Sequence, residues 1–587
     1  MSHRSSLRIT VLALSSIFML LASASLSPAL AKLRRTTATI EITSPDRYSV
    51  VSGIVTIVTQ EQAPISWMNA FVDGRWFVSD GSAKPYSVQW DSTTVPNGRH
   101  TLTVKGYNDA NQQLAQSSIV VHVSNASPTP TIVSTPSQTT PTATSTPTAT
   151  STPTPTSTPT PTGTTYYVSP TGSDSAAGTS SAPWRTIQKA ADMLQPGETA
   201  IVAAGNYGER VSIARAGTLA APIALQAANS ADVKLLGFDL SGSSWVLNGF
   251  DISTQTNGSA GVGIYVTGSA SNDTIENNYI HELCHEGIFM DPTVSHISVL
   301  NNRIWRAEMA GAQVDGTNDL IQGNEVWGTQ QEPVLAGGIY SGCVTPGGAD
   351  ADGFRFFGQY NVFKSNYIHD IYTVSPTNPN PHTDCFQTWG STAMKVDDIL
   401  IEQNFCRWPV ASTTVDAETA MIEGVDGPVG TVTFQNNELS DMRQGIVVGS
   451  NVGALKIYNN TWDHILEEAL IFNDVRSSAD EIINNIFYDV GASGDSYAEV
   501  PSGSPVFEAN DFRMPGGASL GTYPTVESYI SVDPMFLNYG DSTAAGADFH
   551  LQSGSPLKGA GVTLPEVTND YYGTSRGTSG YSIGAAQ

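Results

Sequence analysis

Residues 275–281 read IENNYIH, and this pattern of an asparagine between two short apolar strands returns throughout the C-terminal half of the chain. The later copies are LNNRIW at 300–305, QGNEVW at 322–327, KSNYIH at 364–369, EQNFCR at 402–407, QNNELS at 435–440, YNNTWD at 458–463 and INNIFY at 483–488. A repeat of a few tens of residues is typical of a solenoid, in which each coil buries its apolar face only against its neighbours. The pattern therefore predicts a stack of β-coils with a ladder of asparagines along one edge.

Each repeat divides into three strands. In the repeat that contains Asn302 they are GIFMD at 287–291, HISVL at 296–300 and RIWRA at 303–307. Because side chains alternate along a strand, we expect Ile288 and Met290 to point inward, and Phe289 and Asp291 outward. We expect the asparagines to bond to one another and to the turn backbone, which is a structural role without a catalytic part.

The spacing of the ladder changes in the middle of the domain. Successive asparagines lie 24, 22, 42, 38, 33, 23 and 25 residues apart. The three long intervals place insertions after the third strand at about 328–352, 371–384 and 408–419. Insertions on one corner of neighbouring coils commonly build the binding face of a repeat protein, so we expect a site beside the first sheet.

The rest of the chain divides into three further parts. Arg4 and Arg8 precede an apolar run that ends before Ala29-Leu30-Ala31, so residues 1–31 are predicted to be a signal peptide. Short alternating runs with turn signals predict a β-sandwich over 38–124, and the Thr/Pro/Ser-rich residues 125–165 predict a semi-stiff linker. Residues 166–587 form the solenoid, opened by a short helix around Ile187.

Composition excludes several classes of partner. The chain of 587 residues carries 54 acidic against 27 basic residues, a net charge of −27. Nucleic acid and anionic membranes are therefore excluded as partners, and no segment after the signal is apolar and long enough to span a bilayer. We expect an exported protein, secreted or held at the cell surface, that acts as a monomer.

Four cysteines, an even number in an exported chain, permit two disulfides. Cys284 and Cys343 both lie at the corner of the insertions, and we predict a disulfide between them. Cys406 takes an inward position of a third strand, where a buried thiol is expected.

The ends of the solenoid resemble a known superfamily. YYVSPTGSDSAAGTSSAPWRTIQKAADMLQPGETAIVAAGNYGERV at 166–211, DPMFLN at 533–538 and YSIGAAQ at 581–587 resemble right-handed parallel β-helix proteins of the pectate-lyase-like superfamily. The stretch FVDGRWFVSDGSAKPYSVQWDSTTVPNGRHTLTVKGYND at 71–109 resembles bacterial immunoglobulin-like modules. The fold class is thus all-β: a small immunoglobulin-like β-sandwich, a Thr/Pro-rich linker and a three-sheet right-handed parallel β-helix. Polysaccharide or cell-wall glycan is the partner that this resemblance implies.

The outward positions of the first strands supply the candidate site. The candidates for substrate binding are polar and aromatic residues at neighbouring outward positions, namely Gln313, Gln387, Trp389 and Phe357. The catalytic candidates are Arg355, Asp384, His382, Asp352 and Glu423, and Asp350, Asp352 and Asp384 are candidate ligands of calcium. Cleavage of a uronic-acid polymer by β-elimination requires a base and a cation that neutralises the carboxylate. The resemblance implies an arginine as that base, which is Arg355, and acidic side chains that hold calcium.

Known motifs of the superfamily are incomplete in this chain. The paired arginines of the main pectate lyase family and the NTD, DD, GHG and RIK set of polygalacturonases are absent. ADGF at 351–354 is similar to the DGF strand of another pectate lyase family, but the lysine of that family is not at its position. We therefore expect a polysaccharide lyase for a uronic-acid polymer, with two alternatives. One is a glycoside hydrolase that uses two carboxylates in the same groove; the other is a noncatalytic surface or glycan-binding protein.

Overall fold

The computed structural model describes residues 39–45, 50–62, 65–72, 75–80, 84–95, 98–108, 113–123, 163–228, 232–254, 261–329, 351–371, 382–408, 416–491, 498–499, 503–513, 528–538, 548–577 and 580–587. The predicted signal peptide at 1–31 and linker residues 125–162 lie outside this set. The chain divides into two compact units, Met1–Ile132 and Val133–Gln587. Each unit is described by itself.

The N-terminal unit is a β-sandwich of two sheets. One sheet has the order β1 (Thr39–Ser44), β3 (Ile54–Gln62), β6 (Ser87–Asp91), and the other has the order β2 (Val50–Val51), β8 (Gln113–Val123), β7 (Gly98–Tyr107), β4 (Trp67–Val72), β5 (Arg75–Asp80). A single 3₁₀ turn, η1 (Ser92–Thr94), follows β6. Inward residues such as Met68, Val104 and Val121 are fully buried between the sheets. Alternation along β4 and β6 thus produces the sandwich that the sequence predicts.

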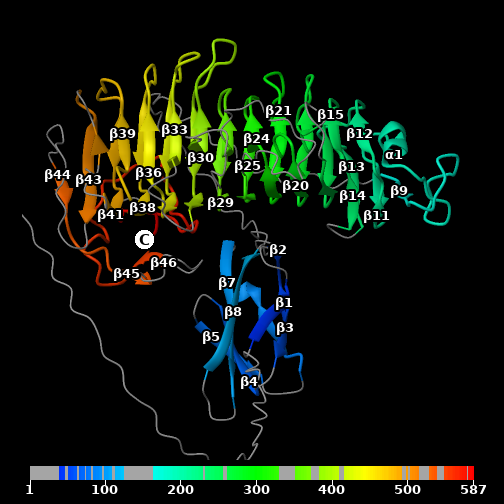
Figure 1. Cartoon of the computed structure of the whole chain (residues 1–587), viewed down its shortest axis with the longest axis horizontal. Helices are drawn as coiled ribbons and strands as arrows, with labels where there is room; N and C mark the ends of the chain where they lie inside the picture. Colours follow the sequence, from blue (N-terminus) through cyan, green and yellow to red (C-terminus); the bar gives the residue numbers. More distant parts are fainter. Residues whose placement is uncertain are drawn as a thin grey trace, which may run out of the picture. The chain divides into compact units, whose positions relative to one another are not determined.

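The C-terminal unit is a right-handed parallel β-helix, and each regular coil contributes one strand to each of three sheets (Figure 1). In the regular coils between the two ends, a strand pairs in parallel with the strand three positions later, as β21 does with β24 and β24 with β27. The first sheet consists of β12 (Arg210–Ile213), β15 (Gly237–Leu240), β18 (Ile264–Val266), β21 (Ile288–Met290), β24 (Ala310–Val314), β27 (Asp352–Phe356), β30 (His382–Thr388), β33 (Asp416–Ile422), β36 (Gln444–Val448), β39 (Leu470–Phe472) and β42 (Ala498–Glu499).

The other two sheets complete each coil. The second consists of β9 (Thr165–Val168), β10 (Thr199–Val202), β13 (Ile223–Ala227), β16 (Trp245–Asn248), β19 (Thr274–Glu276), β22 (Ser298–Leu300), β25 (Leu320–Gln322), β28 (Val362–Lys364), β31 (Ile399–Glu402), β34 (Val432–Gln435), β37 (Leu455–Tyr458) and β40 (Glu481–Ile483). The third consists of β11 (Gly205–Asn206), β14 (Val233–Leu235), β17 (Asp251–Ile252), β20 (Tyr279–Leu283), β23 (Arg303–Ala307), β26 (Glu325–Trp327), β29 (Tyr367–His369), β32 (Phe405–Arg407), β35 (Glu438–Ser440), β38 (Thr461–Ile465), β41 (Ile486–Val490) and β44 (Ser528–Ile530). The long strand β43 (Val506–Arg513) pairs with both β40 and β41, so it continues the second and third sheets as one strand, and β44 pairs with it on the other side.

Both ends of the β-helix carry additional structure. At the start, helix α1 (Ile187–Met193) is capped by Thr186, whose hydroxyl accepts a hydrogen bond from the Lys189 N–H, and it buries Ile187 and Ala190 against the core. At the other end, β45 (Phe536–Asn538) and β46 (Asp548–Leu551) form a hairpin-like pair. Among the described residues, no helix is long and apolar enough to cross a membrane.

The asparagine ladder is confirmed and runs along the turn between the second and third sheets. Its members are Asn278, Asn302, Asn324, Asn366, Asn404, Asn437, Asn460, Asn485 and Asn510. In every member before Asn510, Nδ2 donates to the Oδ1 of the next member, as Asn366 does to Asn404 at 2.9 Å, and also to a backbone carbonyl. The residue before each member has a positive φ, for example 53° at Asn301, so the side chain that follows is turned into the coil.

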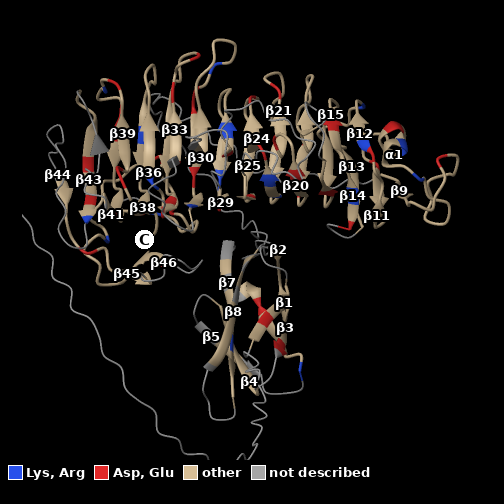
Figure 2. Cartoon of the chain, in the orientation of Figure 1, with Lys and Arg blue, Asp and Glu red and all other residues tan. Residues whose placement is uncertain are grey.

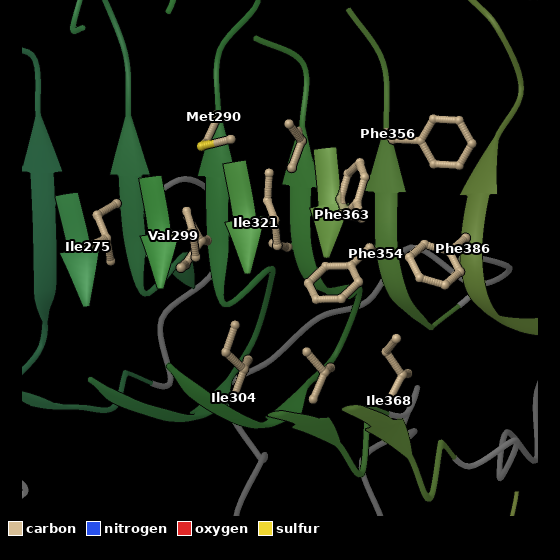
Figure 3. Close-up of a cluster of buried hydrophobic side chains, with 14 of the residues drawn as sticks. Ile275, Met290, Val299, Ile304, Ile321, Phe354, Phe356, Phe363, Ile368 and Phe386 are labelled. Atoms are coloured by element: carbon tan, nitrogen blue, oxygen red, sulfur yellow. The ribbon is translucent and has the colours of Figure 1, made fainter. Parts of the chain in front are cut away.

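The core lies between the three sheets. Ile288 and Met290 are fully buried and Phe289 is half-buried, which confirms the predicted alternation along β21. Beside the insertions, the interior holds the aromatic rings of Phe354, Phe363 and Phe386 in mutual contact (Figure 3). The coils of the candidate site are therefore supported by large, rigid side chains.

Cysteine pairing differs in part from the prediction. Cys385 on β30 and Cys406 on β32 form a disulfide inside the coil, so Cys406 is not the free thiol that was predicted. Cys284 is disulfide-bonded, and its predicted partner Cys343 lies outside the described residues. The missed pair could not be read from strand alternation, because a regular strand would turn Cys385 away from the core.

A buried carboxyl group, Asp319, is expected to make the β-helix less stable as the pH rises. It is fully buried between β24 and β25, where it accepts a hydrogen bond from the Ile297 N–H at 2.8 Å. Burial raises its pKa from 3.8 to about 8. The folded state therefore holds a proton that the unfolded chain releases above pH 4, and the free energy of unfolding falls by roughly 1.4 kcal/mol per pH unit between pH 4 and 8 through this group.

Asp319→Asn should remove this loss. Asn361 takes the equivalent place in the next coil and donates from Nδ2 to the carbonyls of Gly316 and Phe357, at 2.9 and 2.8 Å. We expect the variant to exceed the wild type in stability at pH 8 by at least about 2 kcal/mol, with little difference near pH 4. Denaturant midpoints at both pH values measure this. Asp397→Asn is the control. The ion pair with Lys395 lowers the pKa of Asp397, so its contribution to the free energy of unfolding is lost only as the pH falls below 3.8 and does not change between pH 4 and 8. Equal pH slopes for wild type and Asp319→Asn would refute the assignment.

Candidate functional site

The site lies on the outer face of the first sheet, where strands β24, β27, β30 and β33 stand side by side. Their register aligns Gln313 with Arg355, Arg355 with Gln387 and Gln387 with Met421, so these residues form one column across the sheet. The three predicted insertions connect β26 to β27, β29 to β30 and β32 to β33, so they enter the same corner of three successive coils. Residues 330–350, 372–381 and 409–415 of these insertions lie outside the described residues.

A bend at the start of each strand brings acidic side chains to the outer face. A Cβ added at Gly353 would lie 2.7 Å from Cγ2 of the core residue Ile368, while the next residue, Phe354, is also fully buried. Two consecutive positions therefore face the core, so Asp352 and Arg355 emerge on the same outer side. Cys385 occupies the place next to Gly353 in β30, and its disulfide into the core shows the same bend there.

Arg355 is the centre of the site. Its Nε donates to Asp352 Oδ2 at 2.7 Å, and the side chains of both residues are almost completely removed from solvent. The other oxygen of Asp352 accepts from the backbone N–H of Asp384 at 3.1 Å. The guanidinium carbon lies 5.5 Å from the ring centroid of Trp389, so the cation is placed over an aromatic ring. One carboxylate thus fixes both the arginine and the strand of the next coil.

A second column follows the ends of the same strands and consists of Asp315, Phe357, Trp389 and Glu423. Trp389 is half-buried, and Phe357 packs its ring edge against it with centroids 4.9 Å apart. Phe357 is only 2% exposed and belongs to the core. The prediction that its side chain points outward, toward a substrate, is therefore wrong. Glu423 is half-buried after β33 and donates its backbone N–H to the carbonyl of Thr388. Of the predicted site residues in this column, Trp389 and Glu423 are accessible.

Other predicted residues can be placed only in part. Gln387 and Asp384 are buried on β30. His382 is the first residue of that strand and is aligned with Asp416, but its side chain lies outside the described part of the structure. Gln313 is half-buried on β24 and bonds to Asp315. Asp350 lies outside the described residues.

The described carboxylates do not by themselves form a calcium site. No group of three or more metal-type ligands occurs in the described part of the chain. Both oxygens of Asp352 already accept hydrogen bonds, from Arg355 and from the Asp384 backbone. Because the positive charge of Arg355 lies 2.7 Å from Asp352 Oδ2 and repels a second cation, Asp352 fits an ion pair better than a metal site.

Asp315 is a member of the site that sequence reasoning did not select. It follows β24, is 5% exposed, and accepts hydrogen bonds from Gln313 Nε2 at 3.1 and 3.3 Å. Its place in the outward column was visible in the sequence, but nothing there showed that it is buried. Burial depends on the packing of neighbouring coils, which the order of residues in one coil does not reveal.

Sequence comparison agrees with this architecture. Residues 166–376 match the family described as Pel9A-like, right-handed beta helix region, and residues 39–104 match the bacterial Ig domain family. Pectate lyase PEL9 from Emericella nidulans is 24% identical over 317 residues, which cover 51% of this chain and 73% of that protein. The uncharacterized protein YwoF from Bacillus subtilis is 28% identical over 130 residues, 19% of this chain and 28% of that protein.

Among solved structures, pectate lyase Pel9A aligns with 71% of this chain and 96% of its own, at 16% identity and a TM-score of 0.40. The chain therefore combines a region that matches the bacterial Ig domain family with a right-handed parallel β-helix, of which residues 166–376 match the Pel9A-like family.

Proposed function

We propose that this protein is a polysaccharide lyase that cleaves a uronic-acid-containing polymer by β-elimination in the groove over β24, β27, β30 and β33. The observation that supports this most is the buried Arg355–Asp352 ion pair beside Trp389 on the outward face of the sheet. A uronate needs one cation for its carboxylate and an apolar surface for its ring. Arg355 and Trp389 supply both within one site.

The ion pair changes the role that we expect for Arg355. An arginine stays protonated in proteins, and a carboxylate at 2.7 Å stabilises that charge further. Arg355 is therefore better suited to bind and neutralise the uronate carboxylate than to remove a proton. Neutralisation makes the neighbouring C–H more acidic and stabilises the negative charge that develops during elimination.

Asp384 is the residue that we assign as the base. It lies one coil from Asp352, and its backbone N–H donates to the Asp352 carboxylate, so the two acidic residues are held in a fixed relation. In the proposed step Asp384 takes the proton at C5 of the uronate, the C4–O bond breaks, and a C4=C5 double bond forms. Asp352 acts as a positioning residue for both Arg355 and Asp384.

The charge of the groove restricts where an anion can bind. Arg355 is the one arginine or lysine in strands β24, β27, β30 and β33, and the inserted segments 328–352, 371–384 and 408–419 contain neither residue. Charged residues are sparse along the strands of the β-helix as a whole (Figure 2). A bound polymer therefore has one favourable position for a carboxylate, next to Arg355. In this proposal, the sugar unit whose carboxylate binds there is the unit that is cleaved.

We further propose that the protein acts outside the cell as a monomer, with the immunoglobulin-like domain joined by the linker to the catalytic domain. The signal-like sequence at 1–31 supports export. A cell-wall or environmental polysaccharide is then the accessible substrate.

The test is incubation with a panel of uronate polymers while ultraviolet absorbance of unsaturated products is followed. We expect absorbance to rise with at least one polymer, and Asp384→Ala to abolish the rise. Each reaction is run once with added calcium and once with a chelator. This comparison tests the predicted calcium site, for which Asp350 is a candidate ligand. New reducing ends without absorbance would instead identify a hydrolase. Binding without any product would identify a glycan-binding protein.

A further inference from the structure

Two aromatic side chains lie on the outer face of the first sheet, outside the site described above. Strand register aligns Tyr265 on β18 with Phe289 on β21, and Phe289 with Gln313 on β24. Gln313 is in turn aligned with Arg355. Both rings are half-buried, and they contact each other edge to face with centroids 5.4 Å apart. The column that holds Arg355 therefore continues into two partly exposed rings, which we call the aromatic pair.

The aromatic pair lies where a bound polymer would place further sugar units. Neighbouring strands of a sheet are about 4.8 Å apart, so Phe289 lies two strands, or about 10 Å, from Arg355 along the column. Tyr265 lies one strand further. One unit of an extended sugar chain has about the length of one strand spacing. A polymer that lies along the column with a carboxylate at Arg355 therefore brings the units two and three positions away onto the rings.

The surroundings of the aromatic pair disfavour a second carboxylate. Strands β15, β18, β21 and β24 contain neither arginine nor lysine. Arg210, on the adjoining strand β12, is held by Asp239, with Nη2 to Oδ1 at 2.7 Å, and by the Val262 carbonyl at 2.6 Å. Asp291 follows β21 and forms no ion pair with an arginine or lysine among the described residues. A uronate at the aromatic pair would meet the charge of Asp291 without a cation to neutralise it.

Asp291 is instead suited to accept hydrogen bonds from sugar hydroxyls. Its Oδ1 accepts from the Tyr265 hydroxyl at 3.1 Å, and its Oδ2 accepts from the Thr267 hydroxyl. A carboxylate can accept about four hydrogen bonds, so about two positions remain. An aromatic ring packs against the C–H groups of a sugar ring, while a neighbouring carboxylate accepts from its hydroxyls. This combination fits a sugar that carries no charge.

We propose that the aromatic pair binds an uncharged sugar unit of the same polymer that places a uronate at Arg355. This inference rests on the proposed lyase function and narrows its substrate class. The substrate is then a mixed polymer, with a charged unit at the cleaved position and an uncharged unit two or three positions away. Neutral sugars and methyl-esterified uronates are both uncharged, and the experiment separates them.

The experiment compares three polymers as substrates of the full chain. They are a uronate homopolymer, the same polymer after partial methyl esterification, and a polymer in which several neutral sugars separate the uronates. We expect the wild-type kcat/KM, measured by the absorbance of unsaturated products, to be at least about tenfold higher on one mixed polymer than on the homopolymer. A preference for the esterified polymer assigns an ester to the aromatic pair, and a preference for the other mixed polymer assigns a neutral sugar.

Phe289→Ala tests the role of the rings. We expect it to raise KM on the preferred mixed polymer about tenfold, with kcat changed by less than about threefold, because a distant unit contributes equally to binding of the substrate and of the transition state. Tyr265→Phe keeps the ring and should stay within about threefold of the wild type. Trp305→Ala is the matched control, since Trp305 is also half-buried but lies on the third sheet. Melting temperatures check that each variant folds.

Asp291→Asn tests the role of the charge separately. Removal of this charge should lower KM for the uronate homopolymer by about threefold at low ionic strength, and added salt should reduce the gain because it screens the repulsion in the wild type. Phe289→Ala should change KM for the homopolymer by less than about threefold. The two variants therefore affect different substrates, which a general loss of structure would not produce.

Four results would overturn the inference. They are a wild type whose kcat/KM on both mixed polymers is no higher than on the homopolymer, a Phe289→Ala enzyme with wild-type KM on the mixed polymers, a Trp305→Ala enzyme that is equally impaired, and an Asp291→Asn enzyme with unchanged KM for the homopolymer. Each leaves the lyase function intact, because the wild type is active in all four. A wild type that cleaves no uronate polymer would instead overturn the proposed function.

Discussion

Arg355→Lys should reduce kcat/KM on the cleaved polymer by about 10² to 10³ although the positive charge is kept. The lysine ammonium is a point charge that cannot donate to Asp352 and present a second planar edge to a sugar carboxylate at once. It also loses the guanidinium contact with the Trp389 ring, now 5.5 Å from the centroid. Initial rates of unsaturated product at several substrate concentrations measure the effect.

Lysine is preferred to alanine at this position for a structural reason. Asp352 is fully buried, and removal of its partner would leave an uncompensated charge at a cost of about 3–5 kcal/mol. Arg443→Lys serves as the control, because Arg443 forms a comparable but half-buried pair with Glu467, with Nε to Oε1 at 2.9 Å. An Arg355→Lys enzyme that keeps more than a tenth of wild-type kcat/KM would remove Arg355 from the centre of the site.

Asn366→Ala should lower the free energy of unfolding of the β-helix by about 3–5 kcal/mol. Asn366 is fully buried and accepts from the backbone N–H and Nδ2 of Asn324, both at 3.0 Å. It also donates to the Ile321 carbonyl and to Asn404 Oδ1, both at 2.9 Å. Alanine removes all four bonds and leaves the donors of Asn324 and the Ile321 carbonyl buried without them, at about 1–3 kcal/mol per group.

Denaturant unfolding followed by circular dichroism measures this loss. Asn206→Ala is the matched control, since Asn206 is an exposed asparagine of the same domain outside the ladder, and its replacement should change stability by less than about 0.5 kcal/mol. If Asn366→Ala and Asn206→Ala had the same effect, the ladder would be a by-product of the fold and not a source of its stability.

Much of the fold could be predicted because each coil repeats the same local choices. The alternation of Ile288, Phe289 and Met290 decides which face enters the core, and the asparagine before each third strand marks the turn. The ladder nevertheless continues one coil further than predicted, to Asn510. There Ala509, with a φ of 51°, takes the turn position that Asn, Gly, Ser or Gln fills in the other coils.

The site was harder to predict because it depends on departures from regular strands. The bend at Gly353 and Cys385 brings Asp352 beside Arg355, whereas strict alternation would put the two on opposite faces. The same regular reading turned Phe357 outward, while the structure packs it under Trp389. Spacing therefore identified the right coils, but the direction of side chains at their corners required the packed structure.

The central claim is that bond cleavage in this groove is an elimination and not a hydrolysis. The most direct measurement is mass spectrometry of the products formed in water enriched in heavy oxygen, from the polymer that the protein cleaves most rapidly. Elimination adds no water, so we predict unsaturated ends one water lighter than hydrolysis products, with no heavy oxygen at the new reducing ends. Saturated products that carry heavy oxygen from the solvent would contradict the account.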